Sequence, residues 1–308
     1  MNKIKIRNTL IILLFGFTNS YATSYQLPPN NEALIGKVRY HITTVGENVI
    51  TLAKQYDLGY NAVESANPHM NMARGFTPGN TLQIPSQYLI PNQPRQGIVI
   101  NLPEMRMYYY PKGSHEVVTY PIGIGKIGKT IPITKTRITG KIKDPTWIPP
   151  QDIREFNLEQ GIVLPSIMPP GPDNPLGSYA IYMRIPTYLM HSTIFPESVG
   201  RRASFGCIRM YESDIQSLFP SVYSGIPVVI INSPIKVAWQ KNRLYMEAHY
   251  PLEEYNDSFD ASLPGIVHFI NDSSKNKPIL IDWQLVSYIV REKDGLPYEI
   301  GFTISSNN

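Results

Sequence analysis

The sequence predicts a mainly β protein, built from short strands and many turns. Of its 308 residues, 28 are proline and 20 are tyrosine, whereas only 17% are charged. Frequent turn-forming residues with few charges are typical of a β-rich exported protein and argue against a helical bundle. From Gly97 onward, short apolar segments of strand-like composition follow one another between turns. About 286 mature residues are enough for one large domain and a small one, or for two to three modules.

The first 22 residues have the pattern of an export signal. Lys3, Lys5 and Arg7 form a basic start, residues 9–17 are apolar, and small residues end at Ala22, after which we expect cleavage. The apolar stretch is shorter than the roughly 20 residues that a membrane span needs; a retained N-terminal anchor is the alternative. Removal of the signal lowers the formal charge from +4 to +1. Without a run of Lys or Arg, the chain is not expected to bind nucleic acid.

Residues 38–85 are predicted to form a small β-α-α-β unit. Residues 38–42 alternate as a strand, and Asn48 is positioned to cap a helix that places Val49, Leu52, Ala53 and Tyr56 on one face. A second short helix is expected over 60–66 and a closing strand over 81–85. Residues 86–96 contain two prolines and are predicted to be an extended linker.

The remaining chain divides into residues 97–232 and 233–308. Strands are expected over 98–102, 105–110, 117–122, 135–143, 178–185, 188–191 and 227–231, with a helix beginning at 214. Residues 148–174 are interrupted by prolines and are predicted to be a long loop, which in a compact domain usually has a function. In the last segment we expect a hairpin, 237–240 and 243–248, around Lys241-Asn242 and an amphipathic helix over about 282–292. This segment contains no chemical constellation.

A glycine-rich motif near the middle of the chain resembles a dinucleotide fingerprint. Residues 123–128 read Gly-Ile-Gly-Lys-Ile-Gly and follow a predicted strand. The fingerprint needs a helix N-terminus directly afterwards to hold the pyrophosphate, but residues 130–134 are β-branched and contain Pro132. The sequence therefore excludes the cofactor interpretation and favours glycine-rich backbone beside a site.

Cys207 is the only cysteine, so an internal disulfide is excluded and the thiol is either inert or reactive. Gly206 precedes it, and His191 lies sixteen residues upstream at the end of a predicted strand. A thiol attacks a carbonyl as thiolate, so a nearby base is required, and His191 is the candidate. The amides of Gly206 and Cys207 are predicted to form an oxyanion hole. Arg209 is placed to face an anionic substrate group, and the other five histidines lack comparable surroundings.

Several motifs resemble the L,D-transpeptidase catalytic domain, also called the YkuD domain. The strongest is His191-Ser192-Thr193 followed by Ser204-x-Gly206-Cys207-Ile208-Arg209-Met210. Supporting motifs are Ile122-Gly123-Ile124-Gly125, Asp144-Pro145-Thr146-Trp147-Ile148-Pro149, Gly171-Pro172-Asp173-Asn174-Pro175-Leu176-Gly177 and Ser198-Val199-Gly200. Upstream, the unit over 38–85 resembles a LysM domain through Tyr40, Val45-Gly46-Glu47-Asn48, Asn67-Pro68, Pro78-Gly79 and Leu82-Gln83-Ile84-Pro85. The alternative is a small α/β unit that packs on the next domain without binding glycan.

The resemblance implies a β-rich sandwich or barrel catalytic domain, a βααβ LysM-like domain and a C-terminal α+β extension. The chain is similar to the periplasmic subgroup that includes the enzymes anchoring Braun's lipoprotein to peptidoglycan. It implies that the cysteine is acylated by the L-centre carbonyl of diaminopimelate, with release of D-Ala from a tetrapeptide stem. The acceptor amine is then diaminopimelate of another stem or a lysine of an outer-membrane protein or lipoprotein. Peptidoglycan stems and glycan strands are the implied partners, and a monomer is expected.

By the same resemblance, Cys207 matches the nucleophile, His191 the general base, and Ser192 the residue whose carbonyl orients that base. Arg209, with Ser204 and Phe205, falls at substrate-contacting positions, and neither a metal nor an organic cofactor is implied. One residue departs from the family pattern: Phe205 stands where the family has histidine. A weakly active or inactive peptidoglycan-binding protein is therefore the alternative function. A papain-like endopeptidase is disfavoured, because such enzymes place cysteine before histidine in the chain.

Overall fold

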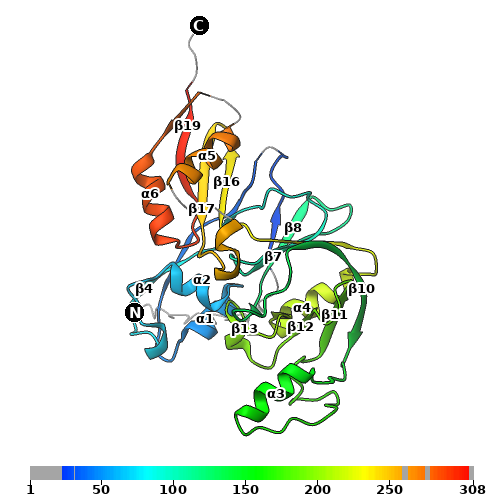
Figure 1. Ribbon diagram of the computed structural model, residues 1–308. Helices are drawn as coiled ribbons and strands as arrows, with labels where there is room; N and C mark the ends of the chain where they lie inside the picture. The colour runs from blue at the N-terminus through cyan, green and yellow to red at the C-terminus, as the bar shows by residue number, and fades with distance from the viewer. Residues whose placement is uncertain (1–22, 31, 259–262, 275–277, 305–308) are drawn as a thin grey trace, which may run out of the picture.

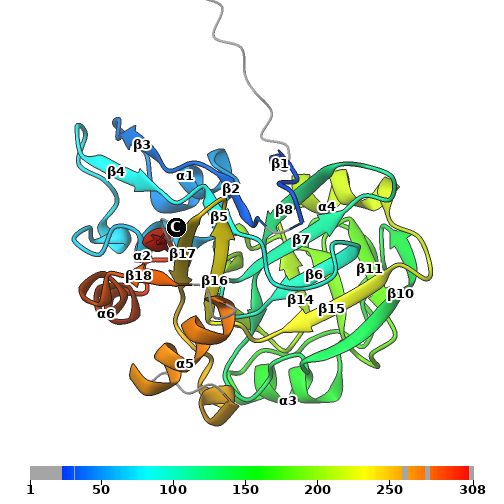
Figure 2. The ribbon, with the colours of Figure 1, turned by 90° about the horizontal axis from the view of Figure 1, so that it is seen from above.

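The computed structural model (Figure 1) describes residues 23–30, 32–258, 263–274 and 278–304, and the predicted export signal lies outside them. The fold is mainly β, as predicted. Its largest element is a curled sheet that forms the right-hand half of the molecule in Figure 2. No helix within the described ranges is both long and apolar enough to cross a membrane.

The central sheet has nine strands, of which β6–β15 and β12–β14 are parallel neighbours and the other neighbours are antiparallel. From one edge to the other the strands are β1 (Thr23–Gln26), β8 (Glu116–Pro121), β7 (Arg106–Tyr110), β6 (Gly97–Asn101), β15 (Pro227–Ile231), β10 (Thr134–Lys143), β11 (Tyr179–Met183), β12 (Leu189–Ser192) and β14 (Ile208–Met210). A two-stranded sheet joins β9 (Ile124–Gly125) to β13 (Arg202–Ser204). Helices α4 (Glu212–Leu218) and η3 (Phe219–Ser221) follow β14.

The ten-residue strand β10 bends the sheet into two halves. Its first part, Thr134 to Arg137, pairs with β15, and its second part, Ile138 to Lys143, pairs with β11. The two halves then pack face to face around one apolar core. Its members include Ile98, Ile100, Met107 and Tyr109 from one half and Ile181, Met183, Met190, Ile208 and Met210 from the other.

Strands β6, β7 and β8 are buried on both faces. Along β7, Met107 and Tyr109 enter the core between the halves, whereas Tyr108 and Tyr110 enter a second core on the opposite face. Val99 and Val117 join that second core from β6 and β8. Alternate residues of a strand point to opposite faces, so the uninterrupted apolar run in β7 reflects two cores.

The other wall of the second core is the N-terminal unit. It contains β3 (Arg39–Ile42), α1 (Val49–Gln55), α2 (Tyr60–Ser65) and β4 (Thr81–Ile84), in the predicted β-α-α-β order, with β3 and β4 antiparallel. Asn48 caps α1 as expected, since its side chain accepts hydrogen bonds from the backbone of Ile50 and Thr51. Helix η1 (Met72–Arg74) lies between α2 and β4.

The predicted linker over 86–96 is partly wrong. Residues Gln87–Leu89 form β5, which pairs with β2 (Leu34–Gly36), and Tyr88 and Leu89 are buried. The two prolines lie after this strand and do not interrupt it. The segment therefore packs against the N-terminal unit and belongs to the fold.

The C-terminal segment forms a four-stranded sheet with two helices and its own core. The predicted hairpin is present, with Lys241 in the left-handed turn conformation at φ 57°. The elements are β16 (Ile235–Gln240), β17 (Arg243–Ala248), η4 (Glu253–Ser258), α5 (Leu263–Ser274), β18 (Ile279–Ile281), α6 (Trp283–Glu292) and β19 (Tyr298–Thr303). The helix expected over 282–292 is confirmed as α6.

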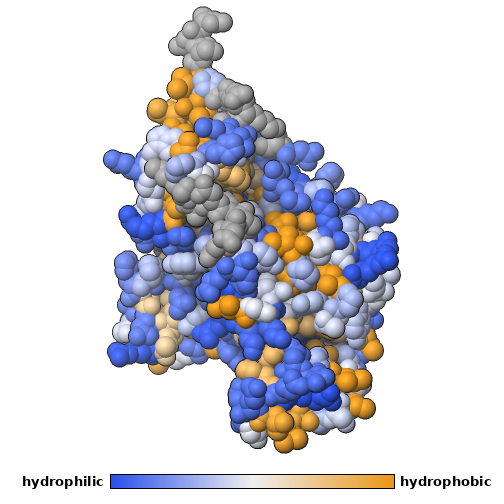
Figure 3. Space-filling view, viewed as in Figure 1, coloured by the Kyte–Doolittle hydropathy of each residue, from blue (hydrophilic) through white to orange (hydrophobic). Residues whose placement is uncertain are grey.

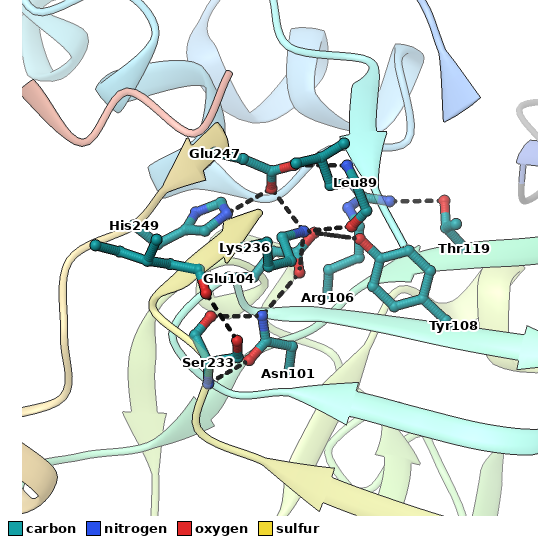
Figure 4. Close-up of polar contacts among 11 residues, drawn as sticks. Leu89, Asn101, Glu104, Arg106, Tyr108, Thr119, Ser233, Lys236, Glu247 and His249 are labelled. Carbon is teal, nitrogen blue, oxygen red and sulfur yellow. Dashed lines mark hydrogen bonds and ion pairs between the residues drawn. The ribbon is translucent and has the colours of Figure 1, made fainter. Parts of the chain in front are cut away.

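A buried ion cluster joins the segment that contains β5, the central sheet and the C-terminal segment (Figure 4). Lys236 Nζ lies 2.9 Å from Glu104 Oε2 and 2.6 Å from Glu247 Oε1, and it donates to the carbonyl oxygen of Leu89 at 2.8 Å. All three ionic side chains are at most 4% exposed. His249 Nε2 also contacts Glu247 Oε1 at 2.7 Å. Because the partners come from β5, the β6–β7 turn and β16–β17, the cluster fixes the segments against one another.

The predicted long loop over 148–174 is wrong in part, because it contains helix α3 (Gln151–Glu159). Trp147 and Met168 exchange two backbone hydrogen bonds of 2.8 Å, which close the neck of a flap, residues 147–168. No residue of α3 is buried. Figure 3 shows apolar residues over α3 at the lower end of the molecule. The exposed apolar side chains of the flap are Ile148, Phe156, Leu158, Ile162, Val163 and Ile167.

Candidate active site

Two parallel strands bring the predicted nucleophile and base together. In the β12–β14 ladder, His191 lies opposite Arg209 and Met190 opposite Ile208. Cys207 immediately precedes β14, so continuing the same register places it beside Leu189 on β12. Neighbouring strands are about 4.8 Å apart. The sixteen residues between His191 and Cys207 therefore form an excursion that returns to the adjacent strand.

His191 is held as a buried imidazole with a defined tautomer. Its Nδ1 lies 2.5 Å from the carbonyl oxygen of Ser192, and the residue is 4% exposed. A carbonyl can only accept a hydrogen bond, so in the neutral ring Nδ1 carries the hydrogen and Nε2 is the basic nitrogen. Burial, followed by the charge of Arg209, lowers the pKa of His191 to about 4, against the opposing effects of the Ser192 and Leu176 backbone. His191 is therefore neutral at pH 7 and able to accept a proton.

The thiol of Cys207 is half-buried, and its raised pKa favours the protonated form at neutral pH. Sγ donates to the carbonyl oxygen of Thr187 at 3.7 Å, and no hydrogen bond joins the described side chains of Cys207 and His191. Burial raises the pKa of Cys207, although the Leu189 amide and the Arg209 charge act in the opposite direction. Thr187 has φ 70°, an uncommon conformation for a β-branched residue. The resting site is thus a neutral thiol beside a neutral imidazole.

This resting state predicts how alkylation of Cys207 by iodoacetamide depends on pH. Since only thiolate reacts and the thiol pKa is raised, the rate constant is expected to increase about tenfold per pH unit from pH 6 to 8. Intact-mass time courses measure it directly, because the chain has no other cysteine. A rate that is already constant across pH 6–8 would show a preformed thiolate–imidazolium pair instead.

Ser204 and Gly206 shape the turn that presents the thiol. The Gly206 amide donates to Ser204 Oγ at 3.0 Å, and Ser204 Oγ donates to the carbonyl oxygen of Cys207 at 2.6 Å. Gly206 has φ 115°, and a Cβ atom there would lie 2.4 Å from Tyr188 Cε1. Only glycine fits directly before the thiol.

These contacts bear on two sequence-based assignments, the oxyanion hole and the substrate contact of Ser204. The Gly206 amide of the predicted pair is already engaged by Ser204 Oγ. Ser204 is 2% exposed, and its hydroxyl is engaged within its own turn, where it holds the loop that carries Cys207. Sequence alone could not show that the serine hydroxyl folds back onto the amide two residues later.

Arg209 lies where an anionic group could be recognised. Its guanidinium is close enough to Cys207 and His191 to lower the pKa of both groups. Its Nε is buried without a hydrogen-bond partner among the described residues. The ring of Phe195 lies 6.0 Å from the guanidinium carbon. An unsatisfied cationic donor beside the nucleophile suits a substrate carboxylate.

The motif over 171–177 holds the base from behind. Ser192 Oγ donates to the carbonyl oxygen of Leu176 at 2.9 Å and accepts from the Tyr179 amide at 3.0 Å. Asn174 is fully buried and donates to the carbonyl oxygen of Pro145 at 2.8 Å, which ties this loop to the base of the flap. At Gly177 a Cβ atom would lie 2.4 Å from Ser192 Oγ. These contacts fix the backbone that carries the Ser192 carbonyl and His191.

Phe205, the departure from the family pattern, contacts the flap. Its ring packs edge-on against Phe156 of α3 with centroids 5.1 Å apart. Lys126 Nζ lies 3.7 Å from the Phe156 centroid and 3.8 Å from the Phe205 centroid, between the two rings. Lys129 forms a 2.7 Å ion pair with Asp152 on the same helix. Phe205 therefore helps to dock α3 beside the cysteine turn.

Replacing Phe205 by alanine is expected to loosen the flap. The aromatic pair and the Lys126 contact together contribute about 1–2 kcal/mol, so the amides of α3 should exchange hydrogen about tenfold faster. Hydrogen-exchange mass spectrometry of the flap peptides measures this. Tyr223→Ala, at a side chain that is 54% exposed and outside this cluster, is the matched control. Unchanged exchange in Phe205→Ala would mean that the ring does not hold α3.

The glycine-rich motif borders the site, as predicted, and no helix follows it. Gly123 exchanges backbone hydrogen bonds of 2.8 and 2.9 Å with Arg209, and a Cβ atom there would lie 2.3 Å from the carbonyl oxygen of Ser198. Gly125 lies in β9, which pairs with β13 just before the cysteine turn. The glycines allow this close approach of backbones. Sequence reasoning missed Thr187, Leu189 and Lys126, whose contacts form only when β9, β12 and the cysteine turn meet.

Comparison with known proteins identifies relatives over most of the chain. Residues 95–230 match the family described as the L,D-transpeptidase catalytic domain (YkuD). The "Probable L,D-transpeptidase YcfS" of Escherichia coli (strain K12) is 37% identical over 287 residues, covering 91% of this chain and 88% of the relative. The "Probable L,D-transpeptidase ErfK/SrfK" of the same organism is 35% identical over 303 residues, covering 94% of each chain.

Among solved structures, the NMR structure of the catalytic domain from E. faecium L,D-transpeptidase shares 23% identity with this chain. It covers 46% of this chain and 99% of the matched chain, with a TM-score of 0.34.

Proposed function

Because this chain belongs to the L,D-transpeptidase family, we propose that it acts on peptidoglycan with Cys207 as nucleophile and His191 as general base. The observation that carries this proposal is the neutral His191, whose Nδ1 is fixed by Ser192 and whose Nε2 is basic, on the strand next to Cys207. The substrate is a tetrapeptide stem with diaminopimelate at its third position. Two relatives, each named a probable L,D-transpeptidase, support the same activity.

In the acylation step, Sγ leaves the Thr187 carbonyl, transfers its proton to His191 Nε2 and attacks the L-centre carbonyl of diaminopimelate. A tetrahedral intermediate forms, and its oxyanion accepts from the Cys207 amide. The C–N bond to D-Ala then breaks, and the imidazolium returns the proton to the departing amine. The products of this step are a thioester on Cys207 and free D-Ala.

In the second step an amine attacks the thioester. His191 takes a proton from that amine, the C–S bond breaks, and the proton returns to Sγ. The amine belongs to diaminopimelate of another stem, which gives a crosslink, or to a lysine of an outer-membrane protein or lipoprotein, which gives an anchored protein. Arg209 binds a stem carboxylate during both steps, since its buried Nε lacks a partner among the described residues.

The N-terminal unit is proposed to bind glycan in the manner of a LysM domain. A cavity of about 320 Å³ lies between this unit and the C-terminal segment. Tyr40, Asn67 and Gln83 line it from one side and Tyr288, Glu292 and Tyr298 from the other. Aromatic faces with nearby polar groups suit a sugar ring. We place the mature protein in the periplasm, where both glycan and stems are accessible.

Two measurements test the proposed activity. Incubation with a carbapenem is expected to add the mass of one intact carbapenem to the wild-type chain and none to Cys207→Ala. Muropeptide profiling of a Cys207→Ala strain is expected to show loss of stem–stem dimers if the acceptor is a stem. Loss of covalently bound protein indicates a protein acceptor. No adduct and an unchanged profile would contradict catalysis and support a binding-only protein in which Phe205 has replaced the family histidine.

A further inference from the structure

Two buried carboxyl groups lie where the N-terminal unit meets the central sheet, far from any role in the proposed chemistry. Asp57 follows α1 and is 4% exposed, and Asp214 in α4 is 3% exposed. Each has one oxygen, Asp57 Oδ1 and Asp214 Oδ2, that is buried without a hydrogen-bond partner in the part of the chain that the structure describes. Among these residues no salt bridge reaches either carboxylate. Buried carboxylates usually have a cationic partner.

Burial disfavours the charged form of both carboxyl groups. Burial raises the pKa of Asp57 to about 6, although the charge of Arg106 and the hydrogen bonds from Thr23 lower it. Burial, followed by the charge of Asp57, raises the pKa of Asp214 well above its ordinary value, although a hydrogen bond from Ser213 and the charges of Arg106 and Lys54 lower it. Arg106 donates to the Asp57 carbonyl oxygen, at 2.9 Å, and to Thr119 Oγ1. Its guanidinium therefore acts on the Asp57 carboxylate through its charge, and no ion pair within salt-bridge distance joins the two described side chains.

The atom that does reach Asp57 is a backbone nitrogen. Thr23 N donates to Asp57 Oδ2 at 2.9 Å, and Thr23 pairs with Thr119 at the start of β1. Thr23 directly follows Ala22, after which the sequence predicts that the export signal is cleaved. Hydrolysis of that peptide bond by a signal peptidase consumes one water, leaves a carboxylate on Ala22 and frees the amine of Thr23. The group facing Asp57 would then be an ammonium with three N–H donors.

We propose that the carboxylate of Asp57 forms a binding site for the N-terminal ammonium of Thr23, which is created when the export signal is removed. One N–H keeps the bond to Asp57 Oδ2, and an added donor can serve the unpartnered Asp57 Oδ1. A positive charge next to a buried carboxylate replaces a neutral amide. Removal of the export signal therefore strengthens the contact between Thr23 and Asp57, and it stabilises the mature fold.

Residues next to the proposed ammonium site connect the N-terminal unit to the loop that leads to the active site. The carbonyl oxygen of Leu58, next to Asp57, accepts from Tyr211 Oη at 3.0 Å. The amides of Tyr60 and Asn61 donate to the carbonyl oxygens of Val199 and Gly200, at 3.0 and 3.2 Å. Residues 199–200 lead into the strand that precedes Cys207. The ammonium site thus anchors the surface on which this loop rests.

The test compares two full-length mature chains, each released from a fusion partner by a protease that leaves no extra residue. One begins at Thr23, and the other carries a single glycine before Thr23, which turns the Thr23 nitrogen back into an amide. We expect the glycine to lower Tm by about 5 °C or more, since an unpaired buried charge is strongly destabilising. In Asp57→Asn chains the same glycine should change Tm by less than about 1 °C. Equal Tm for the two wild-type chains, or an undiminished difference in Asp57→Asn, would overturn the proposal.

Two readouts do not depend on folding of the Asp57→Asn variant. Mass spectrometry of the exported protein should show Thr23 as its first residue, and a different first residue would contradict the site. In the chain that begins at Thr23, the buried amine should react with formaldehyde and cyanoborohydride at least about tenfold more slowly than in the glycine-extended chain. Equal reactivity would show that the ammonium is free in solution.

Discussion

Substitution of His191 by glutamine is expected to slow carbapenem acylation of Cys207 by about 10²–10⁴-fold, because general-base catalysis of the attack is lost. The glutamine amide can still donate to the Ser192 carbonyl oxygen that now accepts from Nδ1, so the loop should keep its shape. It cannot take the thiol proton. Time-resolved intact-mass spectrometry measures the acylation rate constant, and hydrogen exchange checks that the fold is unchanged.

The control for His191→Gln is His115→Gln, at an exposed histidine that follows β7. It should acylate at the wild-type rate. A His191→Gln rate within threefold of wild type would remove His191 from the mechanism.

The pH dependence of the acylation rate constant gives a second test of His191 as the general base. Burial, followed by Arg209, lowers the pKa of His191 to about 4, so His191 loses basicity only as the pH falls toward 4, whereas an ordinary histidine would lose it near 6.5. Arg209→Gln removes one of the two causes of the low pKa of His191. The fall of the acylation rate constant at acid pH should therefore move to higher pH.

Substitution of Lys236 by methionine is expected to destabilise the protein by about 3–5 kcal/mol, because it leaves Glu104 and Glu247 buried without their common cation. The charges of Lys236 and His249 now offset burial and keep the pKa of Glu104 below its ordinary value. Without Lys236, repulsion and desolvation favour opening of the joint between the segments. Urea denaturation followed by tryptophan fluorescence measures the change in the free energy of unfolding.

Two further variants make this experiment decisive. Lys135→Met removes an exposed lysine of β10 and should change stability by less than about 0.5 kcal/mol. Adding Glu104→Gln to Lys236→Met removes one of the orphaned charges and should restore part of the loss. A Lys236→Met protein within 1 kcal/mol of wild type would show that the cluster is not a structural joint.

Elements with a local signal could be predicted from the sequence. The cap at Asn48 and the turn at Lys241-Asn242 are set by neighbouring residues, and both are present. Helix α3 lacks a buried face that would mark it in the sequence, because none of its residues is buried. Strand β5 was hidden for the opposite reason: its partner β2 lies more than fifty residues upstream in the chain. Proline content dominated the local pattern there.

The same distinction holds at the candidate site. Cys207 and His191 stood out by residue type and order, and their placement on adjacent strands follows from the β12–β14 ladder. Whether an amide is free is not a local property: Gly206 is engaged because Ser204 Oγ turns back toward it. Lys126 carries no motif, and its place between Phe156 and Phe205 depends on how the flap docks. The Thr23–Asp57 contact likewise joins residues 34 positions apart.

Because β6 to β8 are buried on both faces, the N-terminal unit is held at a fixed distance and orientation relative to the active site. Val99, Tyr108, Tyr110 and Val117 pack into a core whose other wall is the N-terminal unit, so that unit cannot swing on a tether as an independent module would. A glycan strand held there would be presented to Cys207 at one separation and one angle. Choice among stems would then be geometric, set by how far along the strand a stem is attached. A chain shortened to residues 97–232 would lose this fixed spacing, and it would expose to water the apolar face of β6 to β8 that the N-terminal unit covers.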